Sequence, residues 1–319
     1  MVSQRIWVGQ SQVVRDLEEW ELCEEIFWKR KAQIDWLQEG NGNTAFFHKS
    51  VQALWNGGYI SSLVNSKSIH LTSLQDLCCE ATQYYSALFS EDSPPAGAGE
   101  NMVLACIPTL VTNLMNKSLM CPVSLPELKE VVLERLKVWL PNLISGEKGG
   151  FVASRQILDG VVITSEAIHS MAISRDKSMF IKLDMAKAYD RVKWRFLEKL
   201  LISFGFSQEW VNWMMSCVTP YSFSVIINDE LSILFGASRG LHQGDPLSPY
   251  VFILMAEGLG RFIKARVSQG LIQGWSWVHG IPTLSHFQFV DDTTLLGAAH
   301  LQEAEYFRQT LDIYLASSS

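Results

Sequence analysis

The sequence lacks three things: an excess of basic residues, cysteines at metal-binding spacing and a long hydrophobic run. Its 26 Lys and Arg against 33 Asp and Glu give a net charge of −7. This excludes a protein that wraps nucleic acid with a basic surface, because such proteins neutralise many phosphates, but it leaves room for one local groove. The six cysteines show no C-x-x-C spacing, which excludes the common zinc sites and a small disulfide-stapled scaffold.

Membrane and secretion signals are also missing. No apolar run approaches the ~18 residues that a membrane span needs, and the first ten residues hold no hydrophobic stretch typical of a secretory signal. We therefore expect an intracellular protein, nuclear or cytoplasmic, without a membrane partner. With 319 residues, 48% of them hydrophobic, the chain has the length of one large domain or two ordinary ones.

Helical and linker signals organise the first half. The spacing of apolar residues predicts an amphipathic helix in the first forty residues, which Gly40–Asn43 ends. The segment Glu91–Glu100 is rich in Pro, Gly and small residues and predicts a linker. Ser124–Glu127 resembles a capping box and predicts a helix that runs to about Leu140.

The second half alternates between strand and helix periods. This pattern predicts an α+β fold in which helices cover one face of a small antiparallel sheet. The predicted elements are a strand at Met179–Asp184, a helical face from Tyr189 to Phe204, a helix opened by Ser207, a hairpin of Tyr221–Ile227 with Leu231–Phe235, a helix from Pro246 to Lys264, and a hairpin with Asp291 and Asp292 at its tip.

Three of the acids stand at the ends of apolar strands. Asp184 closes one strand, and Asp291 and Asp292 lie between two apolar stretches. If these strands are neighbours, the acids gather oxygen ligands of the kind that Mg²⁺ prefers. Two such ions ~3.5–4 Å apart serve phosphoryl transfer. An Asp pair in a solvated turn is the alternative interpretation.

The segment Gly240–Pro249 carries a second candidate site. Its glycines allow close backbone approach to a ligand, and Pro246 and Pro249 suit the first turn of a helix. A helix N-terminus of this kind can meet a phosphate or a base edge. A well-capped loop without a ligand explains the same residues.

Together these segments resemble a known family. Leu183–Val192, Gly240–Pro249 and Phe289–Asp292 resemble, in order and separation, three successive motifs of reverse transcriptases, and most closely those of plant non-LTR (LINE-type) retrotransposons. Phe151–Asp159 is similar to the segment that precedes the palm in those proteins, and Trp36–His48 to the stretch that joins their endonuclease to their polymerase. The resemblance runs from about residue 12 to residue 317.

The resemblance implies an RNA-directed DNA polymerase that works on an RNA template, a DNA primer and dNTPs. Asp184, Asp291 and Asp292 correspond to the catalytic acids and, with the backbone carbonyl of Met185, to the ligands of two Mg²⁺ ions. The primer 3′-hydroxyl would then attack the α-phosphate of the nucleotide, and pyrophosphate would leave. The residues that correspond to nucleotide or template contacts are Tyr189, Gln243, Gly244 and Arg155.

For two of these contacts a simpler interpretation stays open. The alternative interpretation of Tyr189 is a core residue of a helix, and that of Arg155 is a surface arginine. Two further acids receive no chemistry: we interpret Asp190 as a structural cap or salt-bridge partner, and Asp245 as part of its loop.

The sequence also departs from the family pattern. The long fingers segment expected after Val132, with its lysine-proline and arginine-proline runs, is not present, and Lys148 stands where Gln is usual. The implied organisation is a helical linker region over 1–90 that normally follows an endonuclease, a flexible linker over 91–101, a remnant of the fingers over 102–150, and a palm over 151–319 without a thumb.

These departures leave two alternatives to the polymerase. One is a catalytically inactive retroelement remnant with no enzymatic role. The other is a metal-dependent nuclease that uses the same acids.

Overall fold

The computed structural model describes residues 59–91, 97–122, 128–153, 155–174, 177–219, 221–276 and 283–319. The helix expected in the first forty residues and the helix start expected at Ser124–Glu127 lie outside these ranges. The chain divides into two compact units, of which the first comprises residues 1–82 and 224–233 and the second residues 83–223 and 234–319. Within the described ranges, no helix is both long enough and apolar enough to cross a membrane.

The described part of the first unit consists of two small hairpins and the start of a helix. Ile60 and Asn228 link its two segments, because the Ile60 N–H donates to Oδ1 of Asn228 at 2.9 Å and Nδ2 of Asn228 donates to the Ile60 carbonyl at 3.0 Å. The elements are β1 (Leu63–Val64) with β2 (His70–Leu71), α3 (Leu74–Leu88), which continues into the second unit, and β6 (Ile226–Ile227) with β7 (Glu230–Leu231).

The second unit combines helices with a four-stranded sheet. Its helices are α4 (Ala98–Leu104), α5 (Asn113–Leu119), α6 (Leu128–Leu143), α7 (Ile157–Ile173), α8 (Trp194–Phe204), α9 (Gln208–Val218), α10 (Ser248–Ser268) and α11 (Leu301–Ser318). Its strands are β3 (Lys148–Gly149), β4 (Ser178–Asp184), β5 (Ser222–Phe223), β8 (Phe235–Gly236), β9 (His286–Phe289) and β10 (Asp292–Ala298).

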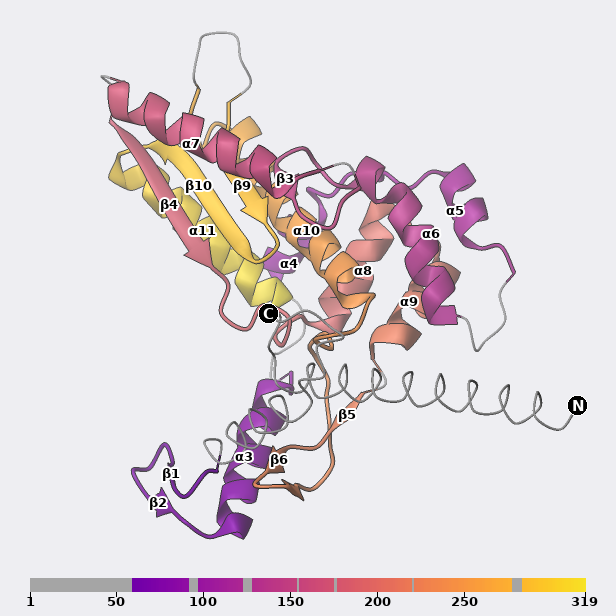
Figure 1. Cartoon of the computed structure of the whole chain (residues 1–319). Helices are drawn as coiled ribbons and strands as arrows, with labels where there is room; N and C mark the ends of the chain where they lie inside the picture. Colours follow the sequence, from indigo (N-terminus) through magenta and orange to yellow (C-terminus); the bar gives the residue numbers. More distant parts are fainter. Residues whose placement is uncertain are drawn as a thin grey trace, which may run out of the picture. The chain divides into compact units, whose positions relative to one another are not determined.

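The sheet has the strand order β3-β9-β10-β4 (Figure 1). β10 pairs antiparallel with both β4 and β9, whereas the short β3 runs parallel to β9. β9 and β10 form the predicted hairpin, so that β10 brings the end of the chain beside β4, which lies more than a hundred residues earlier in the sequence.

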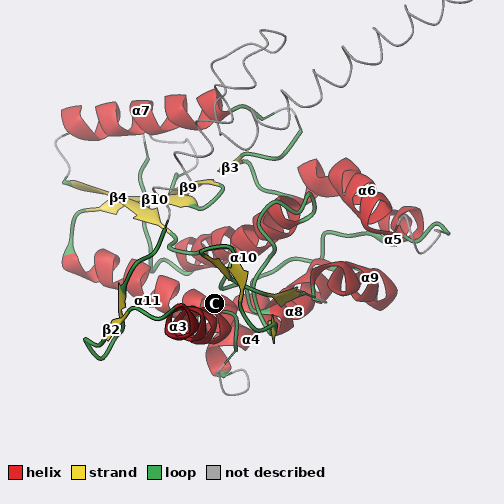
Figure 2. Cartoon of the chain, turned by 60° about the horizontal axis from the view of Figure 1, so that its bottom comes forward, coloured by secondary structure: helices red, strands yellow, loops and turns green. Residues whose placement is uncertain are grey.

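Helices lie on both faces of this sheet (Figure 2). The ring of Phe287 lies against Gly160 of α7, where a Cβ would come within 2.3 Å of it. The neighbouring strand residues His286 and Gln288 point the opposite way, to Gly260 of α10. This alternation follows from the two-residue period of a strand. The predicted α+β class is confirmed, but the expectation that helices cover only one face was wrong, because α7 lies on the face opposite α10.

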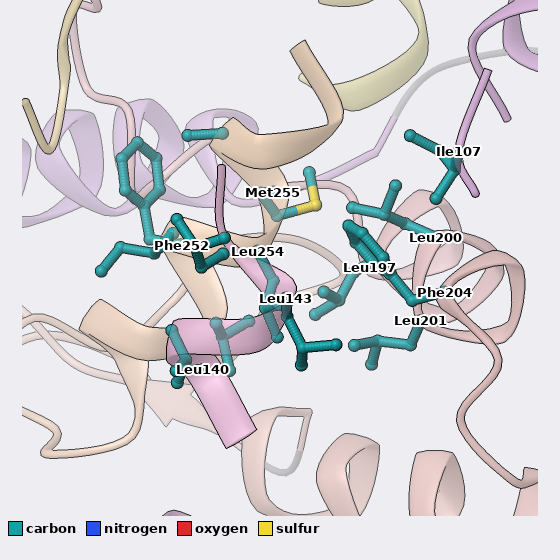
Figure 3. Close-up of a cluster of buried hydrophobic side chains, with 14 of the residues drawn as sticks. Ile107, Leu140, Leu143, Leu197, Leu200, Leu201, Phe204, Phe252, Leu254 and Met255 are labelled. Carbon is teal, nitrogen blue, oxygen red and sulfur yellow. The ribbon is translucent and has the colours of Figure 1, made fainter. Parts of the chain in front are cut away.

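The core of the second unit is built from apolar faces at helical spacing. In α8, the side chains of Phe196, Leu197, Leu200, Leu201 and Phe204 are buried, as the predicted helical face requires. They pack against Leu140 and Leu143 of α6 and against Phe252, Leu254 and Met255 of α10 (Figure 3). Ser207 caps α9 as expected, because its side chain accepts a hydrogen bond from the Trp210 N–H.

The division of the chain differs from the expected boundaries. Residues 98–101, which we expected in a flexible linker, belong to α4, and Glu100 of this helix is buried and pairs with Lys199. The segment 102–150 belongs to the same unit as the sheet. The physical reason is that Leu136, Leu140 and Leu143 of α6 are buried in the shared core rather than in a core of their own.

Candidate active site

The three candidate acids lie at the same end of the sheet. Asp184 is the last residue of β4 and Asp292 the first of β10, and the two are directly opposite in the antiparallel register. Asp291 lies in the two-residue turn that joins β9 to β10, after Val290. The side chain of Asp292 is 42% exposed. The strands therefore bring together acids that are more than a hundred residues apart in the sequence.

The turn before the acids has an unusual backbone. Val290 has a φ of +52°, which a β-branched residue rarely adopts. A positive φ at the first central position of a two-residue hairpin is typical of a type II′ turn, which favours glycine there. Backbone strain of this kind clusters at functional sites. The turn places Asp291 between β9 and β10, and Asp292 at the start of β10.

A lysine that the sequence analysis did not consider pairs with one of the acids. Nζ of Lys182 lies 3.2 Å from Oδ1 of Asp292. Lys182 precedes Asp184 by two residues on β4, and side chains two apart on a strand share a face. The two-residue spacing could have indicated that Lys182 shares a face with Asp184. Its contact with Asp292 depends on the pairing of β4 with β10.

The donor set suits a hard divalent cation. Carboxylate oxygens are the ligands that Mg²⁺ prefers, and Mg²⁺ is commonly held by one or two carboxylates together with water and substrate phosphates. The opposed carboxylates of Asp184 and Asp292 meet that requirement. Within the described ranges, no three His, Cys, Asp or Glu side chains lie close enough together to hold a metal ion by themselves. Met185 follows Asp184 directly, and its half-buried side chain packs against the core.

Tyr189 packs against the core and lies within electrostatic reach of Asp291. Its ring stacks on that of Phe252 in α10, with centroids 4.7 Å apart and planes 15° from parallel. Burial raises the pKa of Tyr189, and the negative charge of Asp291 raises it further. The Tyr189 carbonyl accepts a hydrogen bond of 2.8 Å from the Leu241 N–H. Tyr189 therefore packs against the core, lies within electrostatic reach of Asp291 and accepts a hydrogen bond from the loop that follows Gly240.

The loop over 240–249 carries Gln243 and Gly244 and is tied to Tyr189 through the Leu241 N–H. Nε2 of Gln243 donates to Oδ1 of Asp190 at 3.3 Å, so Asp190 holds the loop rather than capping a helix. Gly240 has a φ of +99°, and a Cβ there would lie 2.9 Å from the Asp190 carbonyl. Gly244 also has a positive φ, +89°, but nothing lies within 4 Å of the position that a Cβ would take there.

Asp245, to which the sequence analysis assigned no chemistry, anchors the loop from inside. Its buried carboxylate accepts hydrogen bonds from Lys129 of α6, from the Tyr221 hydroxyl at 2.8 Å and from the Leu247 N–H at 2.9 Å. Burial alone raises the pKa of an aspartate, but these hydrogen bonds outweigh it and hold the pKa of Asp245 below its usual value. No local sequence pattern around Asp245 indicated its partner, because Lys129 lies 116 residues away in the sequence.

Arg155 has a structural role in this arrangement. Its guanidinium donates to the carbonyls of Ile144, Ser145 and Lys148 at 2.6 to 2.8 Å, and so satisfies the backbone that follows α6. Contact with a template stays a prediction for this residue. Lys148 itself is buried, and burial lowers its pKa to about 7.

The comparison with known proteins now decides the family. Residues 118–318, more than half of the chain, match the family model described as reverse transcriptase (RNA-dependent DNA polymerase). The chain belongs to the reverse transcriptase family. This match spans the strand ends with Asp184, Asp291 and Asp292, the loop with Gln243 and Gly244, and the two helices that flank the sheet.

Two curated proteins are similar to parts of this reverse transcriptase chain. An uncharacterized 149 kDa protein of transposon TX1 from Xenopus laevis is 26% identical over 185 residues, which are 58% of this chain and 14% of that protein. An uncharacterized mitochondrial protein of Arabidopsis thaliana is 44% identical over 69 residues, which are 22% of this chain and 57% of that protein. The chain thus covers about one seventh of the first relative and just over half of the second.

Proposed function

We propose that this chain is the RNA-directed DNA polymerase of a non-LTR, LINE-type retrotransposon of plants. The single observation that carries the proposal is the register that sets Asp184 opposite Asp292, with Asp291 in the adjoining turn. The similarity to a transposon protein supports a retroelement origin, and the similarity to an Arabidopsis protein supports the plant assignment. We expect the protein to act inside the cell, in the nucleus or the cytoplasm.

The acids would hold two Mg²⁺ ions, with the backbone carbonyl of Met185 as a further ligand. These ions would activate the primer 3′-hydroxyl and stabilise the pyrophosphate that leaves. Asp184 and Asp292 stand on neighbouring strands of one sheet, so the backbone that carries their carboxylates keeps a constant separation. Such preorganisation is what electrostatic stabilisation of a transition state requires.

The surrounding residues would bind and orient the substrates. The Tyr189 ring is held by its stack on Phe252 and would exclude a nucleotide that carries a 2′-hydroxyl. Gln243 and Gly244 lie exposed on the loop held by Asp190 and Asp245, where they would contact the dNTP and the template. Three backbone carbonyls already accept hydrogen bonds from the Arg155 guanidinium. Only the rest of this group would be available to contact the template.

Primer extension tests this function. The purified chain would be incubated with an RNA template, an annealed DNA primer, Mg²⁺ and four dNTPs, beside Asp184→Asn and Asp291→Asn. Removal of one preorganised charged group in such a site is expected to lower incorporation at least about 100-fold. Asp312→Asn is the matched control, because Asp312 is an exposed aspartate on α11 that pairs with Arg308. It should extend the primer as the wild type does.

The same experiment decides between the polymerase and an inactive remnant. A melting curve on each sample establishes that it is folded. A wild-type chain that unfolds cooperatively but extends no primer would replace the polymerase by a catalytically inactive retroelement remnant. Degradation of the nucleic acid without extension would instead support a metal-dependent nuclease.

A further inference from the structure

Lys182 and a divalent cation would use the same carboxylate. Nζ of Lys182 lies 3.2 Å from Oδ1 of Asp292, and the side chains are 64% and 42% exposed. Among the salt bridges of the described residues, no other one involves Asp184, Asp291 or Asp292. The pair joins two strands, and its oxygen belongs to an acid that the proposed function assigns to metal binding.

The geometry makes this contact a property of the sheet. In the antiparallel register, Lys182 is opposite Thr294, and Asp292 is opposite Asp184. Lys182 and Asp292 are therefore diagonal neighbours on one face, a separation that a long side chain can bridge. A lysine ammonium is a compact charge on a flexible stem. It can leave Asp292 without any rearrangement of the backbone.

We propose that Lys182 is a positioning residue that competes with the divalent cation for Asp292 and thereby sets the affinity of the site. This inference rests on the proposed role of the acids in metal binding. A cation that binds Asp292 must displace the ammonium, and it then experiences the repulsion of a positive charge a few ångströms away. Because the pair is exposed, salt screens this repulsion.

The inference predicts tighter cation binding when the ammonium is removed. For Lys182→Met, the dissociation constant of Mn²⁺ should fall about 3- to 10-fold at ~0.1 M salt, which is the range expected for a divalent ion near one screened charge. The gain should shrink at ~1 M salt, where the Debye length is ~3 Å. Lys182→Arg keeps the charge and should bind Mn²⁺ within about twofold of the wild type.

Titration of the full chain with Mn²⁺, followed by the electron paramagnetic resonance signal of the free ion, measures these constants. The control is Lys177→Met, because Lys177 is an exposed lysine just before β4 begins, seven residues from Asp184. It should bind as the wild type does. A Lys182→Met chain that binds Mn²⁺ no more tightly than Lys177→Met would overturn the proposal, provided that melting curves show both variants folded, as expected for exposed positions.

The titration also separates this inference from the proposed function. Asp184→Asn should weaken Mn²⁺ binding strongly, because it removes one of the two opposed carboxylates. If the wild type and Asp184→Asn bind Mn²⁺ equally, the metal site itself is refuted and the role of Lys182 with it. If Asp184→Asn loses binding while Lys182→Met equals the wild type, the metal site stands and the competition by Lys182 is refuted.

Discussion

At the scale of single residues, the buried carboxylate of Asp245 carries the most weight outside the three acids. It receives three hydrogen bonds, and one of them comes from the Lys129 ammonium. Asp245→Asn removes the charge that Lys129 pairs with and should lower the free energy of unfolding by about 1–3 kcal/mol at pH 7. Urea denaturation followed by tryptophan fluorescence measures the loss.

The control for this prediction is an exposed ion pair of the same helix. Glu134→Gln breaks the ion pair of Glu134 with Lys137, whose side chains are 69% and 37% exposed, respectively. This substitution should lower the free energy of unfolding by less than about 0.5 kcal/mol. The pKa of Asp245 lies below its ordinary 3.8. Its contribution is therefore present above about pH 4 and is lost as the pH falls through the lowered pKa. Equal losses in the two variants would contradict a special role for Asp245.

At the scale of elements, the loop before α10 contains two glycines that differ in one respect. Gly240 and Gly244 both have a positive φ, +99° and +89°, which costs any other residue about 1 kcal/mol or more. A Cβ at Gly240 would also lie 2.9 Å from the Asp190 carbonyl and 3.1 Å from the Phe89 ring, whereas nothing lies within 4 Å of a Cβ at Gly244.

The two alanine variants should therefore differ in their free energy of unfolding. Gly244→Ala should lower the free energy of unfolding by about 1 kcal/mol, and Gly240→Ala by about 2–4 kcal/mol, because backbone must move to admit its Cβ. Gly244→Ala should nevertheless reduce primer extension, since this residue is proposed to touch substrate. Thermal melting and primer extension on the same samples check both. Equal destabilisation of the two variants would show that the close approach of the Asp190 carbonyl to Gly240 does not affect stability.

At the scale of the whole molecule, one histidine should govern acid stability. His286 is buried between the sheet and α10, and its Nε2 has no hydrogen-bond partner among the described residues. Burial lowers the pKa of His286 to about 3; the negative Glu147 opposes this shift, and the positive Lys148 and Lys264 reinforce it. The folded chain therefore keeps this ring neutral, while the unfolded chain protonates it near pH 6.5.

The sign of the effect follows from the proton count. Below pH 6.5 the unfolded state binds a proton that the folded state refuses, so stability falls as the pH falls towards 3. Between pH 7.5 and 5 this amounts to about 2 kcal/mol. In His286→Gln the loss should disappear, whereas the exposed His70→Gln should retain it. Urea denaturation at both pH values decides, and an unchanged pH dependence in His286→Gln would contradict the prediction.

Much of the fold and the candidate site was predictable because it depends on local patterns. Two-residue alternation identified the strand that ends at Asp184 and the hairpin with Asp291 and Asp292 at its tip, and the structure confirms both. The 3.6-residue spacing identified α10 and the body of α8, and Ser207 identified the start of α9. The predicted start of the α8 face at Tyr189 was wrong, because Tyr189 and Val192 lie before Trp194, where the helix begins. A side chain's period along its own helix or strand is a short-range property, and the sequence alone determines it.

Only the tertiary structure decided which segments meet. The pairing of β4 with β10 sets Asp184 opposite Asp292 and brings Lys182 to the same carboxylate. The packing of α6 against α10 brings Lys129 to Asp245 across 116 residues of sequence and joins the segment 102–150 to the sheet's unit. Two charges interact according to their distance in space. That distance is set when folding buries apolar surface, and the positions of the residues along the chain do not indicate it directly.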